Sequence, residues 1–103
     1  MDLKLSGKLA LVSGSTKGIG LAIATVLARE GAEVIVNGRS EASLARAMEN
    51  ISASVVSARL LGYAGDLSDA TVAAALVKRF PDIDILVNNL GIFEPKPFDE
   101  IPD

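Results

Sequence analysis

Short apolar runs of strand length alternate along the chain with longer segments in which apolar residues recur at helical spacing. The strand-like runs cover residues 9–12, 34–36, 60–64 and 83–87. Because polar residues are rare within these runs, the pattern is typical of strands buried on both faces. The resulting β-α-β-α-β-α-β order predicts an α/β protein whose parallel sheet is covered by helices on both sides.

The three segments between the runs each carry one apolar face. These faces consist of Ile19, Ile23, Val26 and Leu27, then of Leu44, Ala47, Met48 and Ile51, and then of Val72, Leu76, Val77 and Phe80. Ser40 is expected to cap the second helix, and Ser68 or Asp69 the third. Gly31 and Pro81 indicate where the first and third helices end. Beyond residue 87 the pattern stops, and a segment rich in proline predicts a loop.

Composition narrows the class of protein. Of the 103 residues 50% are hydrophobic and 22% charged, which suits a domain with a buried core, and the net charge of −3 argues against a nucleic-acid partner. The chain has no cysteine and no histidine, so we expect no disulfide, no thiol catalysis and no metal site. It has neither a signal-peptide pattern nor an apolar run of about 20 residues. These features predict a cytoplasmic protein with no membrane partner.

Residues 13–20 read Ser-Gly-Ser-Thr-Lys-Gly-Ile-Gly and join the first strand to the first helix. Gly14 permits a sharp turn, Gly18 lets the backbone approach a pyrophosphate, and Gly20 permits close helix packing, while the helix N-terminus offers N–H groups to phosphates. Three glycines also suit a plain turn with a helix cap, but their position between strand and helix favours a dinucleotide site. The predicted binding residues of this turn are Gly14, Ser15, Thr16, Lys17, Gly18, Ile19 and Gly20.

The sequence resembles the short-chain dehydrogenase/reductase family in three motifs along its whole length. The glycine turn is similar to the family's T-G-x-x-x-G-x-G, with Ser13 in place of threonine. Residues 65–67, Gly-Asp-Leu, end the third strand where the family's acidic residue contacts the adenine ring. Residues 88–91, Asn-Asn-Leu-Gly, follow the fourth strand where the family has N-N-A-G, and Leu90 departs from its alanine.

The resemblance implies a doubly wound parallel sheet of the Rossmann type with strand order 3-2-1-4. Residues 1–103 would then form the first half of a single NAD(P)-binding domain. At the switch point between strands 1 and 4, Ser13 and Gly14 are expected to face Asn88 and Asn89. The further cofactor-binding residues that the resemblance implies are Asp66, Leu67, Asn89 and Gly91.

The end of the second strand favours NADP over NAD. An NAD enzyme usually has an acid there to bind the ribose hydroxyls, but Gly38 occupies that position. Glu33 lies at the opposite end of the strand. Arg39 is placed to pair with a 2′-phosphate through its planar fork, and the resemblance to NADP-preferring family members implies a similar place for Lys17 in the glycine turn. Either cation alone would suit a solvated loop; together with the missing acid they predict NADP.

The family's catalytic serine and Tyr-x-x-x-Lys pair lie beyond its N-N-A-G motif. The one tyrosine of this chain, Tyr63, is followed four residues later by Leu67, so it does not match. The resemblance implies hydride transfer between nicotinamide and a carbonyl or alcohol substrate in a complete enzyme, and commonly a homo-oligomer. We expect this chain to be a truncated or proteolysed part of that enzyme, inactive by itself, with no catalytic residue of its own.

Two other interpretations remain open at this stage. The chain can be a non-catalytic NADP-sensing domain on the same half-fold, or a structural α/β fragment that holds no cofactor. The reading frame beyond Asp103 separates these from the enzyme, because a continuation with serine and Tyr-x-x-x-Lys supports catalysis. In any of these cases the apolar fourth strand is a potential edge, which predicts self-association of the chain when it is isolated.

Overall fold

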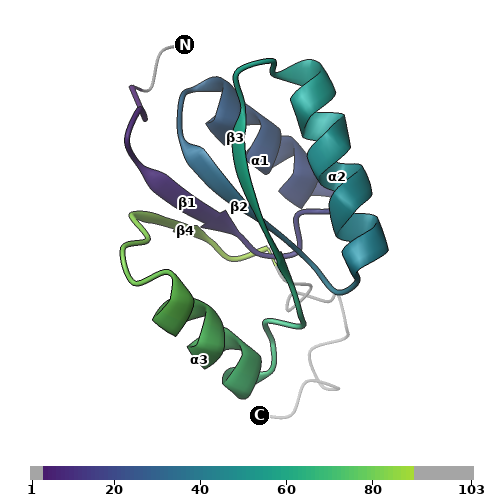
Figure 1. Ribbon diagram of the computed structural model, residues 1–103, viewed down its shortest axis with the longest axis vertical. Helices are drawn as coiled ribbons and strands as arrows, with labels where there is room; N and C mark the ends of the chain where they lie inside the picture. The colour runs from purple at the N-terminus through teal and green to yellow at the C-terminus, as the bar shows by residue number, and fades with distance from the viewer. Residues whose placement is uncertain (1–3, 90–103) are drawn as a thin grey trace, which may run out of the picture.

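The computed structural model describes residues 4–89 of the chain. Four strands and three helices alternate in these residues, as Figure 1 shows: β1 (Leu9–Val12), α1 (Gly18–Arg29), β2 (Glu33–Gly38), α2 (Glu41–Ser54), β3 (Arg59–Ala64), α3 (Ala70–Arg79) and β4 (Ile85–Val87). This succession confirms the order predicted from the hydrophobic pattern.

The four strands form one parallel sheet in the order β3-β2-β1-β4. Val12, the last residue of β1, lies opposite Val36 on one side and Val87 on the other. The chain runs from β1 outward to β2 and β3, and then returns to place β4 on the other side of β1. The predicted Rossmann-type strand order is therefore confirmed, and the switch point lies at the carboxyl ends of β1 and β4.

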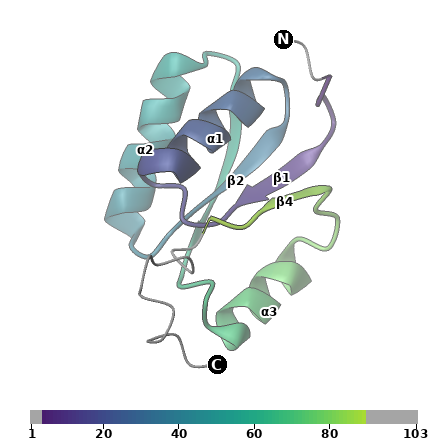
Figure 2. The same ribbon diagram turned by 180° about the vertical axis from the view of Figure 1, so that it is seen from behind.

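Alternate residues of the inner strands enter two separate cores. Ala10 and Val12 pack with α1 and α2, whereas Leu11 packs with Ile35 and with Leu76 of α3. Figures 1 and 2 show α1 and α2 side by side, with α3 apart from them. Because successive side chains of a strand point to opposite faces, the helices cover both sides of the sheet.

The predicted face of helix α1 is confirmed only in part, because Ile23 and Leu27 pack against the core while two other members of that face do not. Its buried residues are Gly20, Ala24 and Ala28, whereas Ile19 and Val26, both expected in the core, are 72% and 44% exposed. The buried residues recur every four positions and are small, so the helix axis lies close to the sheet. For Ile19 and Val26 the prediction was wrong because it ranked positions by side-chain size and overlooked the stripe of small residues.

The fourth strand is shorter than predicted and begins at Ile85 instead of Ile83. The Asp84 carboxylate accepts a hydrogen bond from the Leu9 N–H at 2.8 Å, and so takes a main-chain donor that regular pairing would give to a carbonyl. In α3, Leu76 is buried as expected, but Val77 is 59% exposed and Leu86 of β4 is 67% exposed. An apolar surface therefore remains between α3 and β4 in the described part of the chain.

Candidate functional site

The carboxyl ends of β1 and β4 are joined through Ser13. Its hydroxyl accepts a hydrogen bond from the Asn89 N–H at 2.8 Å and lies within bonding distance of the Val87 carbonyl and the Asn88 side-chain oxygen. The Asn89 side-chain amide donates to the Gly14 carbonyl at 3.1 Å. Ser13 and Gly14 thus face Asn88 and Asn89 across the switch point, as predicted from the strand order.

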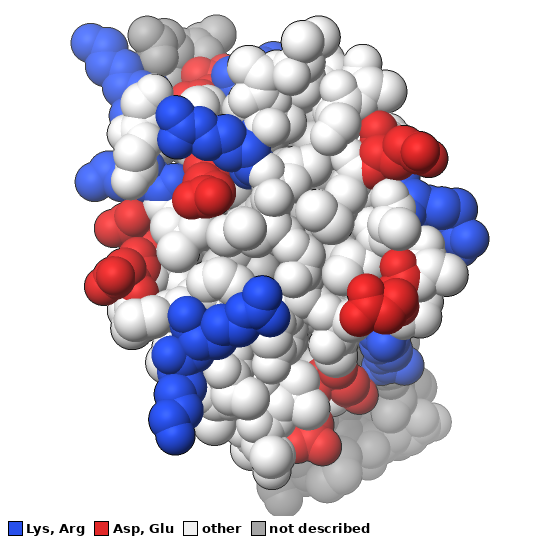
Figure 3. All heavy atoms as spheres, viewed as in Figure 1, with Lys and Arg blue, Asp and Glu red and all other residues white. Residues whose placement is uncertain are grey.

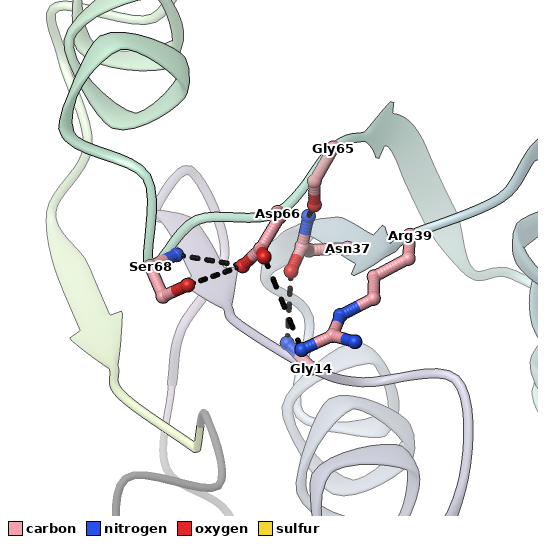
Figure 4. Close-up of polar contacts among 6 residues, drawn as sticks. All are labelled: Gly14, Asn37, Arg39, Gly65, Asp66 and Ser68. Carbon is pink, nitrogen blue, oxygen red and sulfur yellow. Dashed lines mark hydrogen bonds and ion pairs between the residues drawn. The ribbon is translucent and has the colours of Figure 1, made fainter.

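Asn37, at the end of β2, connects three segments of the site. Its side-chain oxygen accepts a hydrogen bond from the Gly14 N–H at 2.9 Å, and its amide donates to the carbonyls of Tyr63 and Gly65 at 2.9 and 3.1 Å. The residue is 1% exposed. Figure 4 shows Asn37 between the glycine turn and the end of β3. Sequence reasoning did not assign this residue to the site; the signal was an amide within an otherwise β-branched, buried strand.

Ser15 holds the glycine turn against β2. Its hydroxyl donates to the Val12 carbonyl at 2.7 Å and accepts from the Asn37 N–H at 2.8 Å, while its own N–H donates to the Asn37 carbonyl at 2.8 Å. The side chain is fully buried. The hydroxyl and the N–H of Ser15 therefore both form hydrogen bonds within the protein, and these bonds fix the glycine turn against β1 and β2.

The N-terminus of α1 has no side-chain cap, unlike those of the other two described helices. The Ser40 side chain accepts a hydrogen bond from a backbone N–H in the first turn of α2, and the Asp69 side chain does the same in α3. The Lys17 side chain, at the start of α1, accepts no such bond. Gly18 has a φ of +61°, and a Cβ placed on it would meet no atom within 4 Å. The first N–H groups of α1 thus form an open cradle that suits the phosphates of a dinucleotide.

Gly20 has the opposite surroundings. A Cβ at this position would lie 2.3 Å from the Gly14 carbonyl oxygen and 2.5 Å from the Asn89 side-chain nitrogen. The absence of a side chain lets the first turn of α1 pass close to the glycine turn and to the residue that follows β4. The predicted close packing at Gly20 is therefore observed, although the contact is with these loops and not with the strand itself.

A cleft of about 860 Å³ opens at this edge of the sheet. Six of the predicted binding residues line it, namely Gly14, Thr16, Lys17, Arg39, Asp66 and Asn89. The glycine turn, the end of β2 and the end of β3 thus contribute to one hollow. Sequence reasoning missed the α2 side of the cleft, formed by Ser43, Arg46, Ala47 and Asn50, whose spacing of three, four and seven residues marks one helical face.

Arg39 and Asp66 approach each other at the mouth of the cleft. The Arg39 Nη2 lies 3.9 Å from the Asp66 Oδ2, and the two side chains are 83% and 43% exposed. Figure 4 shows the guanidinium extended across the cleft towards Asp66 and the glycine turn. An ion pair this exposed adds little to stability, so Arg39 can exchange Asp66 for another anion at small cost.

The Asp66 carboxylate is held by Ser68. The Ser68 hydroxyl donates to Asp66 Oδ1 at 2.6 Å, and the Ser68 N–H donates to the same oxygen at 3.0 Å. These two bonds, followed by the charge of Arg39, lower the pKa of Asp66 below its ordinary value. Asp66 therefore remains an ionised hydrogen-bond acceptor throughout the neutral pH range.

Two further predicted binding residues, Leu67 and Ile19, are not among the residues that line the cleft. Leu67 lines a smaller hollow of about 190 Å³ between α3 and β4, and Ile19 projects into solvent. Gly91 lies outside the described residues, as does Leu90.

Residues 4–89 contain no group of three or more carboxylates that could hold a metal ion. None of the described helices is both long and apolar enough to cross a membrane. On the face of the molecule shown in Figure 3, basic and acidic side chains are interspersed.

A parallel sheet with a glycine-rich turn at its switch point is the architecture of Rossmann-type proteins. The family model of the short chain dehydrogenases matches residues 8–103. The chain is 48% identical over 103 residues to the uncharacterized oxidoreductase YvaG of Bacillus subtilis, and 42% identical over 98 residues to the gluconate 5-dehydrogenase of Gluconobacter oxydans. It covers 39% and 38% of these two proteins, and they cover 100% and 93% of it.

Solved structures give the same result. The crystal structure of L-sorbose reductase from Gluconobacter frateurii, complexed with NADPH and L-sorbose, matches with a TM-score of 0.82 and 36% identity, over 100% of this chain and 40% of that one. The chain belongs to the short chain dehydrogenase family, and it spans about two fifths of the length of the curated relatives it matches.

Proposed function

We propose that this chain is the first part of a single NAD(P)-binding domain in an NADP-dependent oxidoreductase of the short-chain type. Its role is to bind the dinucleotide, while the serine and the Tyr-x-x-x-Lys pair that the family uses for proton transfer come from sequence beyond residue 103. The bound nicotinamide supplies or accepts the hydride. The substrate is a carbonyl compound or the corresponding alcohol.

The observation that carries this proposal is the open cradle at α1 beside two cations. The uncapped N–H groups at Gly18 and the following residues suit the pyrophosphate. Lys17 and Arg39 line the same cleft and suit a further phosphate on the ribose. Since β2 ends in Gly38, no carboxylate stands there to bind the ribose hydroxyls of NAD. Asp66 and Asn89 complete the cleft at the ends of β3 and β4.

The test is turnover by the full-length protein. Purified protein is mixed with NADPH and a panel of ketones, aldehydes and sugars, and NADPH consumption is followed by absorbance. The proposal expects consumption with at least one carbonyl compound, slower consumption with NADH, and none with the 103-residue chain alone. Tight NADPH binding without turnover of any substrate would favour a non-catalytic sensing protein, and turnover by the 103-residue chain alone would contradict the assignment of the proton donors to later sequence.

A further inference from the structure

Gly38, the last residue of β2, has no side chain, and its backbone conformation does not explain why. L-amino acids with a side chain avoid positive φ angles, but the φ of Gly38 is not in that range. A residue with a side chain could therefore adopt the backbone conformation of Gly38. The position is nevertheless closed on one side. A Cβ on Gly38 would lie 2.3 Å from the methyl carbon of Thr16 and 3.4 Å from the Ser43 hydroxyl oxygen. Space, and not conformation, requires glycine here.

Thr16 cannot move away together with its backbone. Ser15, the preceding residue, is hydrogen-bonded to Asn37 in both directions, and Asn37 precedes Gly38. These bonds hold the next residue of each segment, Thr16 and Gly38, side by side. Rotation of the Thr16 side chain offers relief in only one rotamer, because a β-branched residue has heavy atoms in two of its three staggered positions.

The consequence concerns cofactor selection. In a dinucleotide site of this type, an acid near the end of the second strand binds the ribose hydroxyls of NAD, and a nearby arginine binds the 2′-phosphate of NADP. We propose that Thr16 is a specificity-determining residue: its methyl group keeps position 38 free of a side chain and so leaves the space beside Arg39 to the phosphate. This inference rests on the proposed NADP preference.

The inference changes the expectation drawn from the sequence. At the end of β2, the sequence bases the NADP preference on two positions, Gly38 and Arg39. The contact with Thr16 adds a third position. An aspartate at 38 in the presence of Thr16 must force the Thr16 side chain from its position or displace the glycine turn, and the cradle for the pyrophosphate beside it is then disturbed for both cofactors.

The experiment compares four variants of the full-length protein: Gly38→Asp, Thr16→Ser, Thr16→Ser with Gly38→Asp, and Thr16→Val with Gly38→Asp. Serine removes only the methyl group, whereas valine keeps the shape of threonine and serves as the matched control. The melting temperature without cofactor reports the steric conflict. Fluorescence titration with NADPH and with NADH, at one salt concentration, reports cofactor selection.

We expect Gly38→Asp to lower the melting temperature by roughly 2–10 °C, whether residue 16 is threonine or valine. With Thr16→Ser most of that loss is recovered. NADPH affinity falls about tenfold or more in every Gly38→Asp variant, whereas NADH affinity rises about tenfold only when Thr16→Ser is also present. If the Gly38→Asp variant does not fold but the double variant with Thr16→Ser and Gly38→Asp does, that outcome also supports the steric conflict with Thr16.

Equal melting temperatures and equal NADH affinities of the serine and valine double variants would overturn the inference. Recovered stability without a gain in NADH affinity would overturn the role of Thr16 in cofactor selection. Equal binding of NADPH and NADH by the unmodified protein is a different result, because it contradicts the proposed NADP preference whatever the melting temperatures show.

Discussion

The side-chain oxygen of Asn37 accepts a hydrogen bond from the N–H of Gly14 at 2.9 Å. One buried amide thereby fixes the glycine turn relative to β2, and its nitrogen does the same for the end of β3 through the carbonyls of Tyr63 and Gly65. The glycine turn, the end of β2 and the end of β3, which all line the cleft, are linked through this single residue. The rigidity of the site therefore depends on a residue outside the glycine motif.

Asn37→Asp tests this connection in the full-length protein. The carboxylate keeps the acceptor for Gly14 but has no donor for the two carbonyls of β3, so buried oxygens face each other. We expect a loss of about 3 kcal/mol in the free energy of unfolding, measured by urea denaturation. Asn50→Asp, the same change at an exposed site on α2, should alter stability by less than about 0.5 kcal/mol. Similar losses for both variants would show that Asn37 has no such role.

Gly20→Ala should destabilise the protein, although alanine is ordinarily the better helix residue by about 1 kcal/mol. The added methyl would meet the Gly14 carbonyl and the Asn89 amide, and relief of such overpacking costs about 1–3 kcal/mol. Ala22→Gly, at an exposed position of the same helix, measures the propensity term alone. The account is wrong if Gly20→Ala raises the melting temperature.

Ser68 should determine the acidity of Asp66. The folded-state pKa of Asp66 lies below its ordinary value, so its ionised form favours the folded state at neutral pH, and this contribution disappears as the pH falls through the lowered pKa. Ser68→Ala should raise that pKa more than Arg39→Ala does, because the Ser68 bonds are the larger cause. Ser68→Thr, which keeps the hydroxyl, should leave it low. Carboxyl NMR titration measures all three, and a larger effect of Arg39→Ala would reverse the assigned order.

The isolated 103-residue chain should self-associate through β4. This strand pairs with β1 on one side, and Leu86 is 67% exposed beside the apolar hollow against α3. Leu86→Lys should shift the chain towards monomer in sedimentation velocity. Val56→Lys, at a 96% exposed valine between α2 and β3, is the matched control and should change nothing. A monodisperse monomer before any substitution would contradict this expectation.

The sequence predicted most of the architecture because each strand and helix repeats its signal over several residues. The sequence was a poorer guide where the packing of an element depends on residues with small side chains or none. Ala24 and Ala28 pack α1 against the sheet, and Gly20 lets its first turn approach the adjoining loops, yet such small residues leave a weak hydrophobic pattern. The same holds for Gly38, whose meaning depends on Thr16, a residue 22 positions away that only the folded chain brings beside it.

The glycine turn was predictable as a whole, but the roles of its members were not. Sequence spacing could not show that the Ser15 side chain is buried under the turn while Thr16 lines the cleft. Nor could it show that the Asn37 side chain bonds to both the glycine turn and the end of β3, because side-chain partners distant in sequence leave no local pattern. Fold and site location follow from periodicity and strand order, whereas these roles follow from contacts.

The central claim is that Arg39 binds the 2′-phosphate of NADPH. The most direct measurement is the dissociation constant of NADPH and of NADH for the unmodified full-length protein and for Arg39→Ala, by fluorescence titration at fixed salt because the contact is screened. Arg59→Ala, at the opposite end of the sheet, is the control. Loss of the charge-assisted bonds should weaken NADPH by about ten- to a hundredfold and leave NADH nearly unchanged. If the unmodified protein binds both cofactors equally, or if Arg39→Ala weakens both by the same factor, the assignment of NADP to this site is wrong.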